Sequence, residues 1–461
     1  MTPRARVADV GDERTRSHQR AWSWYDWANS AYVTTTGTVL ISPYLTALAR
    51  ADACPGLPAD QACRTDLSVL GVPVAVGSLA PYTITVATIV SAVFLLVVGA
   101  AADRTAHPTR LLGAFAWLGS AAAMGMFFLT GTNWQLGVVL LIVANLCLGS
   151  SIVVYDALLV RIAHPDDRDA VSSRGWALGY LGGGLLLALN LGLLQVHEAL
   201  GVSYEMAVRL SLFSAGAWWA IFTLVPVWGL RRVAGTTREP VAARSGTVLG
   251  AFTQLRSTFR EMRLFPQTLL FLLAYLFFND GIQTVIYSAS LYGSEELGFE
   301  AGQLILTILL VQFVAFGGSL LFGRVAGRFG AKRVVLAGLA LWTAVVAFAF
   351  VVPAGAYAVW LVCATCIGIV LGGTQALSRS MYSQLVPAGR ESEFFSFYQA
   401  MERGTSWLGT LAFGLIFQLT GSYRLSIIAL IAFFVIGGLL LARVDMRKGI
   451  DDAGNQQPAI V

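Results

Sequence analysis

Ionisable residues interrupt several stretches of this chain that are otherwise apolar enough to cross a bilayer. They are Asp26, Asp156, Asp280, Arg379 and the adjacent pair Glu402 and Arg403. A charge at the centre of a membrane costs about 2.5–3.5 kcal/mol on insertion scales, so it is retained where it has a partner or lines a polar cavity. These residues therefore predict a path for a polar solute through a bundle of helices.

Membrane-spanning helices are the elements that must position these charges. Of 461 residues, 56% are hydrophobic and 12% are charged, and the mean hydropathy of +0.68 lies outside the range of soluble domains. A helix needs ~20 apolar residues to cross a bilayer, and the chain holds about twelve such segments. We predict an all-α membrane protein with spans at 24–48, 79–102, 111–130, 135–160, 172–195, 206–230, 267–293, 302–322, 334–352, 357–385, 393–418 and 424–443.

The basic residues predict the orientation of these spans, because Lys and Arg resist translocation. Most of the 31 fall in the two tails and in alternate loops, and the exceptions are Arg50, Arg64, Arg209 and Arg424. Both termini are therefore expected in the cytoplasm, with no cleaved signal peptide before the first span. The excess of Arg over Lys, with many Ala and Gly residues, is typical of a GC-rich bacterial genome and favours the plasma membrane. The net charge of +5 follows from this loop bias and indicates no nucleic-acid partner.

The cysteine and histidine residues give little support for redox or metal chemistry. Cys147, Cys363 and Cys366 lie within apolar spans and are typical of small hydrophobic residues. Cys54 and Cys63 share the long outer loop, where a disulfide that tethers the loop is left open. The 4 His residues lie in tails or loops, and the sequence has no Gly-Lys-Ser/Thr nucleotide-binding loop. We expect no cofactor, no metal, and neither an enzyme nor an ATP-driven pump.

The two halves of the chain repeat one another. A Gly-x-x-x-Asp-Arg pattern at 99–104 closes the second span, and a related pattern at 323–333 closes the eighth, about 220 positions later. Pro165–Asp169 after span four is matched by Pro387–Glu391 after span ten, at a nearly equal offset. The repeats indicate two six-helix bundles with pseudo-two-fold symmetry. The predicted divisions are a cytoplasmic tail (1–23), a first bundle (24–230), a cytoplasmic linker (231–266), a second bundle (267–443) and a cytoplasmic tail (444–461).

These loops resemble those of the major facilitator superfamily, in which Gly-x-x-x-Asp-Arg-x-Gly-Arg-Arg joins the second and third helices. Residues 99–104 match its first half, and Gly327 stands where the second copy would have its Asp. The resemblance implies the major facilitator fold, with loops that latch the cytoplasmic side; an ordinary loop cap is the alternative. Asp103 and Arg104 could pair there with a base on span four or with acids at the start of span eleven. The expected gate residues are Gly99, Asp103, Arg104, Arg161, Gly323, Arg328 and Glu391.

Three longer motifs narrow the resemblance. They are Trp-Tyr-Asp-Trp-Ala-Asn-Ser-Ala-Tyr at 24–32, a Gly-rich run at 172–183 and Gly-Gly-Thr-Gln-Ala-Leu-Ser-Arg-Ser at 372–380. They look like the signatures of the family of vacuolar effluxer proteins linked to autophagy and their bacterial relatives. Fungal members of that family are associated with the release of amino acids from the vacuole, so the resemblance implies amino-acid efflux.

Helical spacing places polar side chains of several spans on common faces. In the superfamily that the chain resembles, the first, fourth, seventh and tenth helices line the cavity, and each corresponding span here holds an ionisable residue. The stretches 111–130, 334–352 and 425–442, in spans three, nine and twelve, hold none. Asp280 is the best candidate to contact a substrate amine or carry a coupled proton. The residues expected along the solute and proton path are Asp26, Asn29, Tyr32, Asn145, Asp156, Asn279, Asp280, Gln283, Tyr287, Gln375, Arg379, Glu402 and Arg403.

Several of these charges also have a purely structural interpretation. Asp26 could cap the first span within an interfacial aromatic belt. Asp156 could pair with a base at the inner surface, such as Arg161. Glu402 and Arg403 could simply neutralise each other.

We predict a secondary active transporter that moves a small polar organic solute by alternating access. The favoured solute is an amino acid and the favoured direction is efflux. Coupling to protons is favoured because the spans hold more buried carboxylates than residues that fit a sodium-site pattern. Transport of a sugar, drug or lipophilic cation by the same fold is the alternative, and a membrane-embedded sensor or enzyme is the other class. The expected partners are the solute, protons and membrane lipids, and the protein is expected to act as a monomer.

Overall fold

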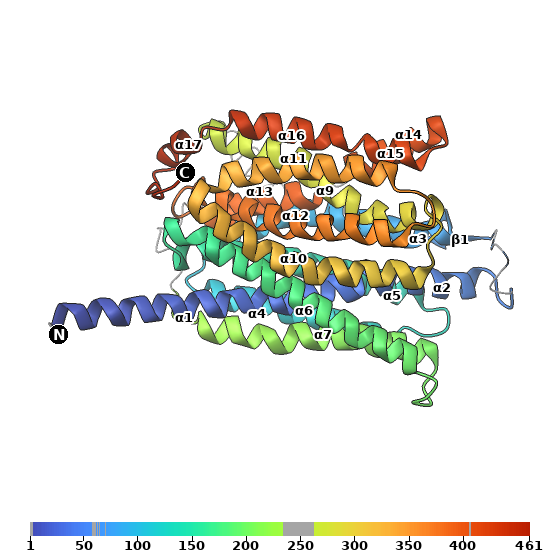
Figure 1. The fold of residues 1–461 in the computed structure, drawn as a ribbon. Coiled ribbons are helices and arrows are strands. Elements are labelled where there is room, and N and C mark those ends of the chain that lie inside the picture. The colour runs from blue at the N-terminus through green and yellow to red at the C-terminus, as the bar shows by residue number, and fades with distance from the viewer. Residues whose placement is uncertain are drawn as a thin grey trace.

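Long helices run side by side through the molecule, and both chain termini lie at the same end of it (Figure 1). We name this the termini end, and the opposite end, which carries a β-hairpin, the hairpin end. The computed structural model describes residues 3–461 apart from 58–60, 62, 64, 70, 234–261 and 405–406. Most of the predicted linker, with Arg238 and Arg244, therefore lies outside the described residues.

The first half of the chain forms the first bundle. Its first span is divided among α1, a π-helical segment η1 and α2. The elements are α1 (Pro3–Tyr32), η1 (Val33–Leu40), α2 (Ile41–Ala53), β1 (Asp66–Val69), β2 (Val72–Ala75), η2 (Val76–Ser78), α3 (Leu79–Ala102), α4 (Pro108–Gly125), η3 (Met126–Phe128), α5 (Trp134–Ile162), η4 (Pro165–Asp167), α6 (Arg168–Val196) and α7 (Tyr204–Gly229).

The second half forms the second bundle, in which span twelve is divided between two helices. The elements are α9 (Pro266–Glu295), α10 (Ala301–Phe329), α11 (Ala331–Val351), α12 (Tyr357–Gln384), α13 (Glu391–Gly404), α14 (Trp407–Thr420), α15 (Tyr423–Ile428), α16 (Ile431–Arg443) and α17 (Met446–Asp452). Between α10 and α11, Gly330 has φ +86°, a left-handed conformation that ends one helix and lets the next begin at once.

The fold agrees with the twelve predicted spans. Among the described residues, 10 helices are long and apolar enough to cross a membrane. Two predicted spans are missing from that set. The span at 24–48 is divided among α1, η1 and α2, and the span at 393–418 includes residues 405–406, which lie outside the described residues. The side chains that α3 exposes include Val86, Val90, Val93 and Val97, an apolar stripe suited to lipid.

Helix packing follows the predicted pseudo-two-fold symmetry. In the first bundle α4 packs on α5 and α7, and α3 packs on α5. The corresponding contacts in the second bundle are α11 with α12 and α16, and α10 with α12. The bundles meet through α3 against α13 and through α10 against α6, which are again equivalent pairs. The prediction of a major facilitator fold is therefore confirmed.

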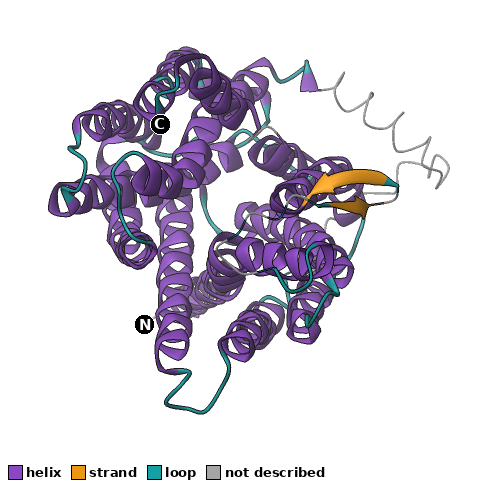
Figure 2. Cartoon of the chain, turned by 90° about the vertical axis from the view of Figure 1, so that its right-hand side faces the viewer, coloured by secondary structure: helices purple, strands orange, loops and turns teal. Residues whose placement is uncertain are grey.

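The hairpin end carries the one departure from an all-helical chain among the described residues. Strands β1 and β2 pair antiparallel, with Asp66 opposite Ala75 and Val69 opposite Val72, and Figure 2 shows them over the helix ends. Cys54 and Cys63, whose pairing the sequence left open, form a disulfide in the same loop.

Candidate functional site

A single guanidinium group from the second bundle is held by the first. Arg379 on α12 donates to Asp26 on α1 (Nη2 to Oδ2, 2.9 Å) and to Asp156 on α5 (Nη1 to Oδ1, 3.3 Å). It also donates from Nε to the Ser172 hydroxyl on α6, at 3.0 Å. All four side chains are buried. Because each partner belongs to the other bundle, these bonds exist only while the bundles meet.

Aromatic rings enclose the same guanidinium. Its central carbon lies 4.8 Å from the ring centroid of Trp22 and 5.4 Å from those of Tyr155 and Trp176. Such contacts favour a desolvated cation. The Tyr155 hydroxyl also donates to Asp26 Oδ2 at 2.8 Å, and the ring stacks on Trp22. These rings therefore fix both the arginine and its carboxylate partner.

The network continues along α13 through an amide. Gln399 Nε2 donates to Asp156 Oδ2 at 3.0 Å and to Glu402 Oε2 at 3.1 Å, so one side chain joins two carboxyl groups. Glu402 also accepts from the Tyr275 hydroxyl at 3.1 Å. Arg403 Nε donates to the Gln399 side-chain oxygen at 3.4 Å, and its side chain reaches the position of Gly149 on α5. With Arg379 and Asp26, the network holds three carboxyl groups and two guanidinium groups.

The predicted amide surface closes on itself. Gln375 Nε2 donates to Asn279 Oδ1 at 2.9 Å, and Asn279 Nδ2 donates to the Glu402 backbone oxygen at 3.4 Å. The amides of α9 and α12 thus brace α13. Asn29 and Asn145 instead donate to carbonyl oxygens one turn earlier in their own helices.

The remaining predicted path residues differ in their surroundings. Tyr32 is buried and stacks on Trp219, with ring centroids 5.3 Å apart. Tyr287 is 58% exposed, and Gln283 is half-buried. Asp280 is buried but lies against α14, where its Oδ2 accepts the Gly409 backbone N–H at 2.7 Å. Among the described residues, Asp280 makes no hydrogen bond to the side chains of the network around Arg379.

At the termini end, the cap of one helix comes from the other bundle. Asp103, at the end of α3, accepts the backbone N–H groups of Ser392 and Glu393 at 2.8 Å each, which satisfies the first turn of α13. Burial raises the pKa of Asp103 to about 6, although these two hydrogen bonds act to lower it. The Asp103 carboxylate therefore joins the end of α3 to the start of span eleven across the two bundles.

The other predicted gate residues include some that make contacts between the bundles and some that do not. Arg161 pairs with Glu391 at 3.2 Å across the bundles, and the cation that pairs with Asp156 is Arg379. Gly99 faces Ser392 and Ser396, and Gly323 faces Ser173, in both cases too closely for a Cβ atom. Arg104 and Arg328 are exposed and make no ion pair with any described residue.

Two residues at the termini end, Arg168 and Asp169, were missed as gate residues by the sequence reasoning. Arg168 donates from Nη1 to the Ser383 carbonyl at 2.8 Å and to the Gln384 side chain at 3.1 Å. Asp169 accepts the Ser380 hydroxyl across the same contact. The repeated motif at Pro165–Asp169 was the signal that could have found both, since it lies at the α5–α6 junction.

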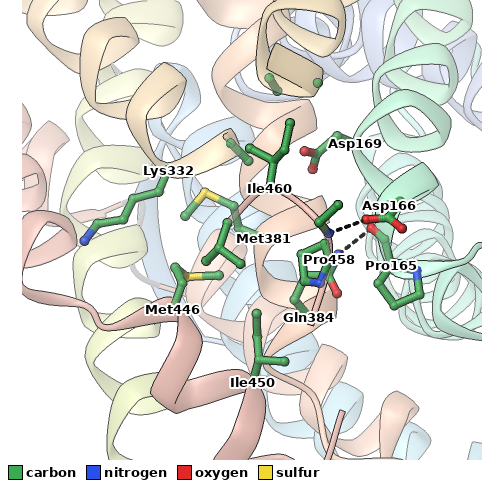
Figure 3. Close-up of a pocket in the computed structure, with 15 residues that line it drawn as sticks. Pro165, Asp166, Asp169, Lys332, Met381, Gln384, Met446, Ile450, Pro458 and Ile460 are labelled. Atoms are coloured by element: carbon green, nitrogen blue, oxygen red, sulfur yellow. Dashed lines mark hydrogen bonds between the residues drawn. The ribbon is translucent and has the colours of Figure 1, made fainter. Parts of the chain in front are cut away.

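The C-terminal segment also crosses this end. Asn455 Nδ2 donates to the carbonyls of Gln384 and Val386 at the end of α12, and Ala459 N donates to Asp166 Oδ1 of the first bundle at 2.6 Å. Between the segment and the helices is a cavity of about 240 Å³. Figure 3 shows Asp166, Met381, Gln384 and Ile460 around it.

Comparisons with known proteins agree with this geometry. The sequence model of a family described as "Vacuole effluxer Atg22 like" matches residues 14–454. An uncharacterised MFS-type transporter of Bacillus subtilis (strain 168), YxiO, is 30% identical over 447 residues, which are 96% of this chain and 98% of that protein. Autophagy-related protein 22 of Cryptococcus neoformans var. neoformans serotype D (strain B-3501A) is 32% identical over 305 residues, 61% of this chain and 54% of that protein.

Solved structures share the fold. The proton:xylose symporter XylE, of the major facilitator superfamily, superposes with a TM-score of 0.70 at 12% identity, covering 96% of this chain and 99% of that one. A bacterial homologue of the iron transporter ferroportin in its outward-facing state has a TM-score of 0.64 at 13% identity, covering 93% and 98%. These likenesses concern the arrangement of the helices.

Proposed function

Because this chain belongs to the vacuole effluxer Atg22-like family of major facilitator transporters, we propose that it carries a zwitterionic amino acid across the membrane by alternating access, coupled to protons. The observation that carries the proposal is the buried network of both charge signs that the two bundles share. Its members are Asp26, Asp156, Arg379, Glu402 and Arg403. An amino acid brings one carboxylate and one ammonium group, and each finds groups of opposite charge in this network.

Arg403 is the group that we assign to the carboxylate of the solute. Its side chain is half-buried, whereas Arg379 is enclosed on all sides by carboxylates, a hydroxyl and rings. The Nε atom of Arg403 donates to Gln399 at 3.4 Å. Its two Nη groups make no hydrogen bond to any described residue, and we assign them to bind a carboxylate bidentately. Glu402, which precedes Arg403 in the chain, then lies beside the bound solute, and we assign it to the ammonium group of the solute.

The amides favour an amino acid over a sugar. Gln375 and Asn279 are bonded to each other and to α13, and Asn29 and Asn145 are bonded within their own helices. One N–H donor of each amide is therefore already used, and a sugar hydroxyl that accepted the same N–H group would have to displace that bond.

Closure of the termini end supports alternating access at this site. Bonds cross between the bundles within the network, at Arg379. They also cross at the termini end, at Asp103, Arg161 and Arg168. The distribution of basic residues supports a cytoplasmic termini end, and hence an outward-facing conformation in the plasma membrane. Alternating access itself has no preferred direction and is therefore compatible with efflux. We propose efflux driven by proton entry.

Counterflow into proteoliposomes with a pooled, labelled amino-acid mixture tests the proposal. Wild-type protein is expected to exchange the label, and an imposed pH gradient should increase its accumulation. Arg403→Gln should abolish exchange, whereas the exposed Arg328→Gln should retain it. Absence of exchange by folded wild-type protein would contradict the amino-acid assignment and bring sugars and lipophilic cations forward.

A further inference from the structure

The buried network that the two bundles share holds one more carboxyl group than it holds guanidinium groups. Arg379 and Arg403 are its cations, and Asp26, Asp156 and Glu402 are its acids. A surplus negative charge away from water is costly, and uptake of a proton by one of the acids removes it. The network is therefore neutral with one proton bound.

Asp156 is the acid whose charge is least well compensated. Asp26 accepts two bonds from Arg379, from Nη2 at 2.9 Å and from Nη1 at 3.3 Å, and a third from the Tyr155 hydroxyl. Asp156 shares the same Nη1 at 3.3 Å and otherwise accepts from the neutral amide of Gln399 at 3.0 Å. It is 1% exposed, so water does not compensate its charge. The one guanidinium that it contacts is already matched by Asp26.

No second cation contacts Asp156 among the described residues. The titratable groups that face it are Asp26 on α1, Tyr155 on α5, Arg379 on α12, and Tyr398 and Glu402 on α13. Helix α3 has no charged residue, and Arg403 on α13 donates to Gln399 instead. The other charged residues of the elements packed on α5 are exposed, bound elsewhere or near helix ends; they are Arg50 and Asp52 on α2, Arg110 on α4, Arg161 on α5 itself, Arg168, Asp169 and Arg174 on α6, and Glu391 and Glu393 on α13.

Gln399 links Asp156 to the site that we assign to the solute. Its Nε2 donates to Asp156 and to Glu402, and its Oε1 accepts from Arg403 Nε. A protonated Asp156 is itself a donor, and a half-turn of the Gln399 amide presents Oε1 to it in place of Nε2. The same half-turn takes the donor away from Glu402 and the acceptor away from Arg403.

A buried hydroxyl beside Glu402 is available when the amide turns. Tyr398 lies one turn before Glu402 on α13, and its ring stacks on Tyr275 with centroids 4.2 Å apart. The Tyr275 hydroxyl already donates to Glu402. The Tyr398 hydroxyl is buried and has no hydrogen-bond partner among the described residues. Tyr398 can therefore replace Gln399 as a donor to Glu402.

We propose that Asp156 is the binding site of the coupled proton and that Gln399 makes proton and solute compete. A proton from water forms an O–H bond at Asp156 Oδ2, and the Gln399 amide turns. Glu402 and Arg403, no longer held by Gln399, pair with each other and release the solute. When the termini end opens, Arg379 leaves with its bundle and water reaches Asp156, so the proton is released there. The competition rests on the proposed function, whereas the proton site does not.

Asp156→Asn tests the site, because asparagine is neutral and its amide can donate to Gln399 as a protonated acid would. Arg379 keeps Asp26 as its partner, so we expect thermal stability to be retained. In counterflow at alkaline pH, the amino-acid concentration for half-maximal exchange should rise about tenfold over wild type. It should no longer depend on pH, whereas in wild type it should rise as the pH falls. Asp445→Asn, which alters the exposed cap of α17, is the matched control and should behave as wild type.

Gln399→Met separates the proton site from its link to the solute. Methionine fills a similar volume but cannot bridge two carboxyl groups with N–H donors. Asp156 should still bind a proton in this variant, while exchange loses its dependence on pH. Exchange with the pH dependence of wild type would overturn the role of Gln399.

Infrared spectroscopy reads the proton site without a solute. Titration of the membrane-embedded protein between about pH 5 and pH 9 should show a protonated-carboxyl C=O band in wild type and Gln399→Met that is missing in Asp156→Asn. An identical band in Asp156→Asn would overturn the proposal, as would gradient-driven accumulation equal to that of wild type. Joint loss of exchange and thermal stability in that variant would show that Asp156 only anchors Arg379. If folded wild-type protein exchanges no amino acid, the proposed function fails while the infrared comparison still decides the proton site.

Discussion

Arg379 is bound by carboxylates that belong to the other bundle, so its loss should affect both stability and conformational change. Arg379→Ala leaves Asp26 and Asp156 buried without their cation, and removing one partner of a buried pair costs about 3–5 kcal/mol. Arg379→Lys keeps the charge but cannot bridge two carboxylates and a hydroxyl at once. We expect the alanine variant to melt earlier and the lysine variant to fold but exchange at least about tenfold more slowly.

Thermal melting of the purified protein, together with counterflow, checks this prediction. Replacing Asp26 by Asn in the alanine background should recover part of the lost stability, because one uncompensated charge is removed. Arg328→Ala serves as the control for loss of an exposed arginine. A lysine variant with wild-type exchange would show that the cross-bundle bonds of Arg379 do not limit the cycle.

At this scale the sequence identified individual charges but not their partners. The cost of burying a charge marked Asp26, Asp156 and Arg379, yet Arg379 lies 353 positions from Asp26 and 223 positions from Asp156 in the sequence. Pairing across that distance depends on how the bundles dock, which no local spacing encodes. The enclosing rings of Trp22 and Trp176 were missed for the same reason, since an aromatic residue near a membrane interface has a simpler explanation.

At the scale of helices, the cap of α13 by Asp103 should respond to pH. The pKa of Asp103 is raised to about 6 in the closed contact, against 3.8 for a solvated carboxyl. The closed state therefore holds the proton more tightly than an open state in which Asp103 meets water. Closure at the termini end is stabilised as pH falls through 6 towards 4, and that gain is lost as pH rises.

Spin labels at the exposed positions Arg104 and Arg328, in opposite bundles, measure this equilibrium by pulsed dipolar spectroscopy. The short-distance population should grow between about pH 8 and pH 5. Asp103→Asn should remove the pH response and change the transport rate more than the folding yield. A response that persists in this variant would assign it to another group.

Close contact between α10 and α6 makes a second prediction for helices. A Cβ atom at Gly323 would lie 2.6 Å from the Ser173 side chain, whereas Gly327, one turn later on α10, has nothing within 4 Å. Gly323→Ala should therefore separate the helices at the termini end, and Gly327→Ala should not. The same spin-label pair should show a larger long-distance population in Gly323→Ala alone; equal distributions in both variants would contradict the prediction.

The helices themselves were predicted well except where they break. The span predicted at 79–102 coincides with α3, because apolar length defines a membrane helix. The π-helical segment η1, which divides the first span, was not predicted, because a broken span keeps the apolar composition of a continuous one. Asp280 was singled out by its charge, but its hydrogen bond to the Gly409 backbone depended on how α9 packs against α14.

At the scale of the whole molecule, the repeated motifs predicted two related bundles, and the equivalent contacts α3–α13 and α10–α6 follow from that symmetry. The conformation did not follow, since both the open and the closed termini end satisfy the same repeat. The closed state depends on contacts specific to one docking of the bundles, such as Arg168 with Ser383.

The C-terminal segment adds a tie between the bundles that lies outside the repeat. Ala459 donates its backbone N–H to Asp166, and Asn455 holds the segment on the end of α12. Ala459→Pro removes this backbone N–H donor but still carries a small apolar side chain, whereas Ala459→Gly keeps the donor. We expect the proline variant to raise the long-distance population at the termini end and to speed exchange if opening there limits the cycle. Matching distributions in the proline and glycine variants would show that the segment rests on the closed face without stabilising it.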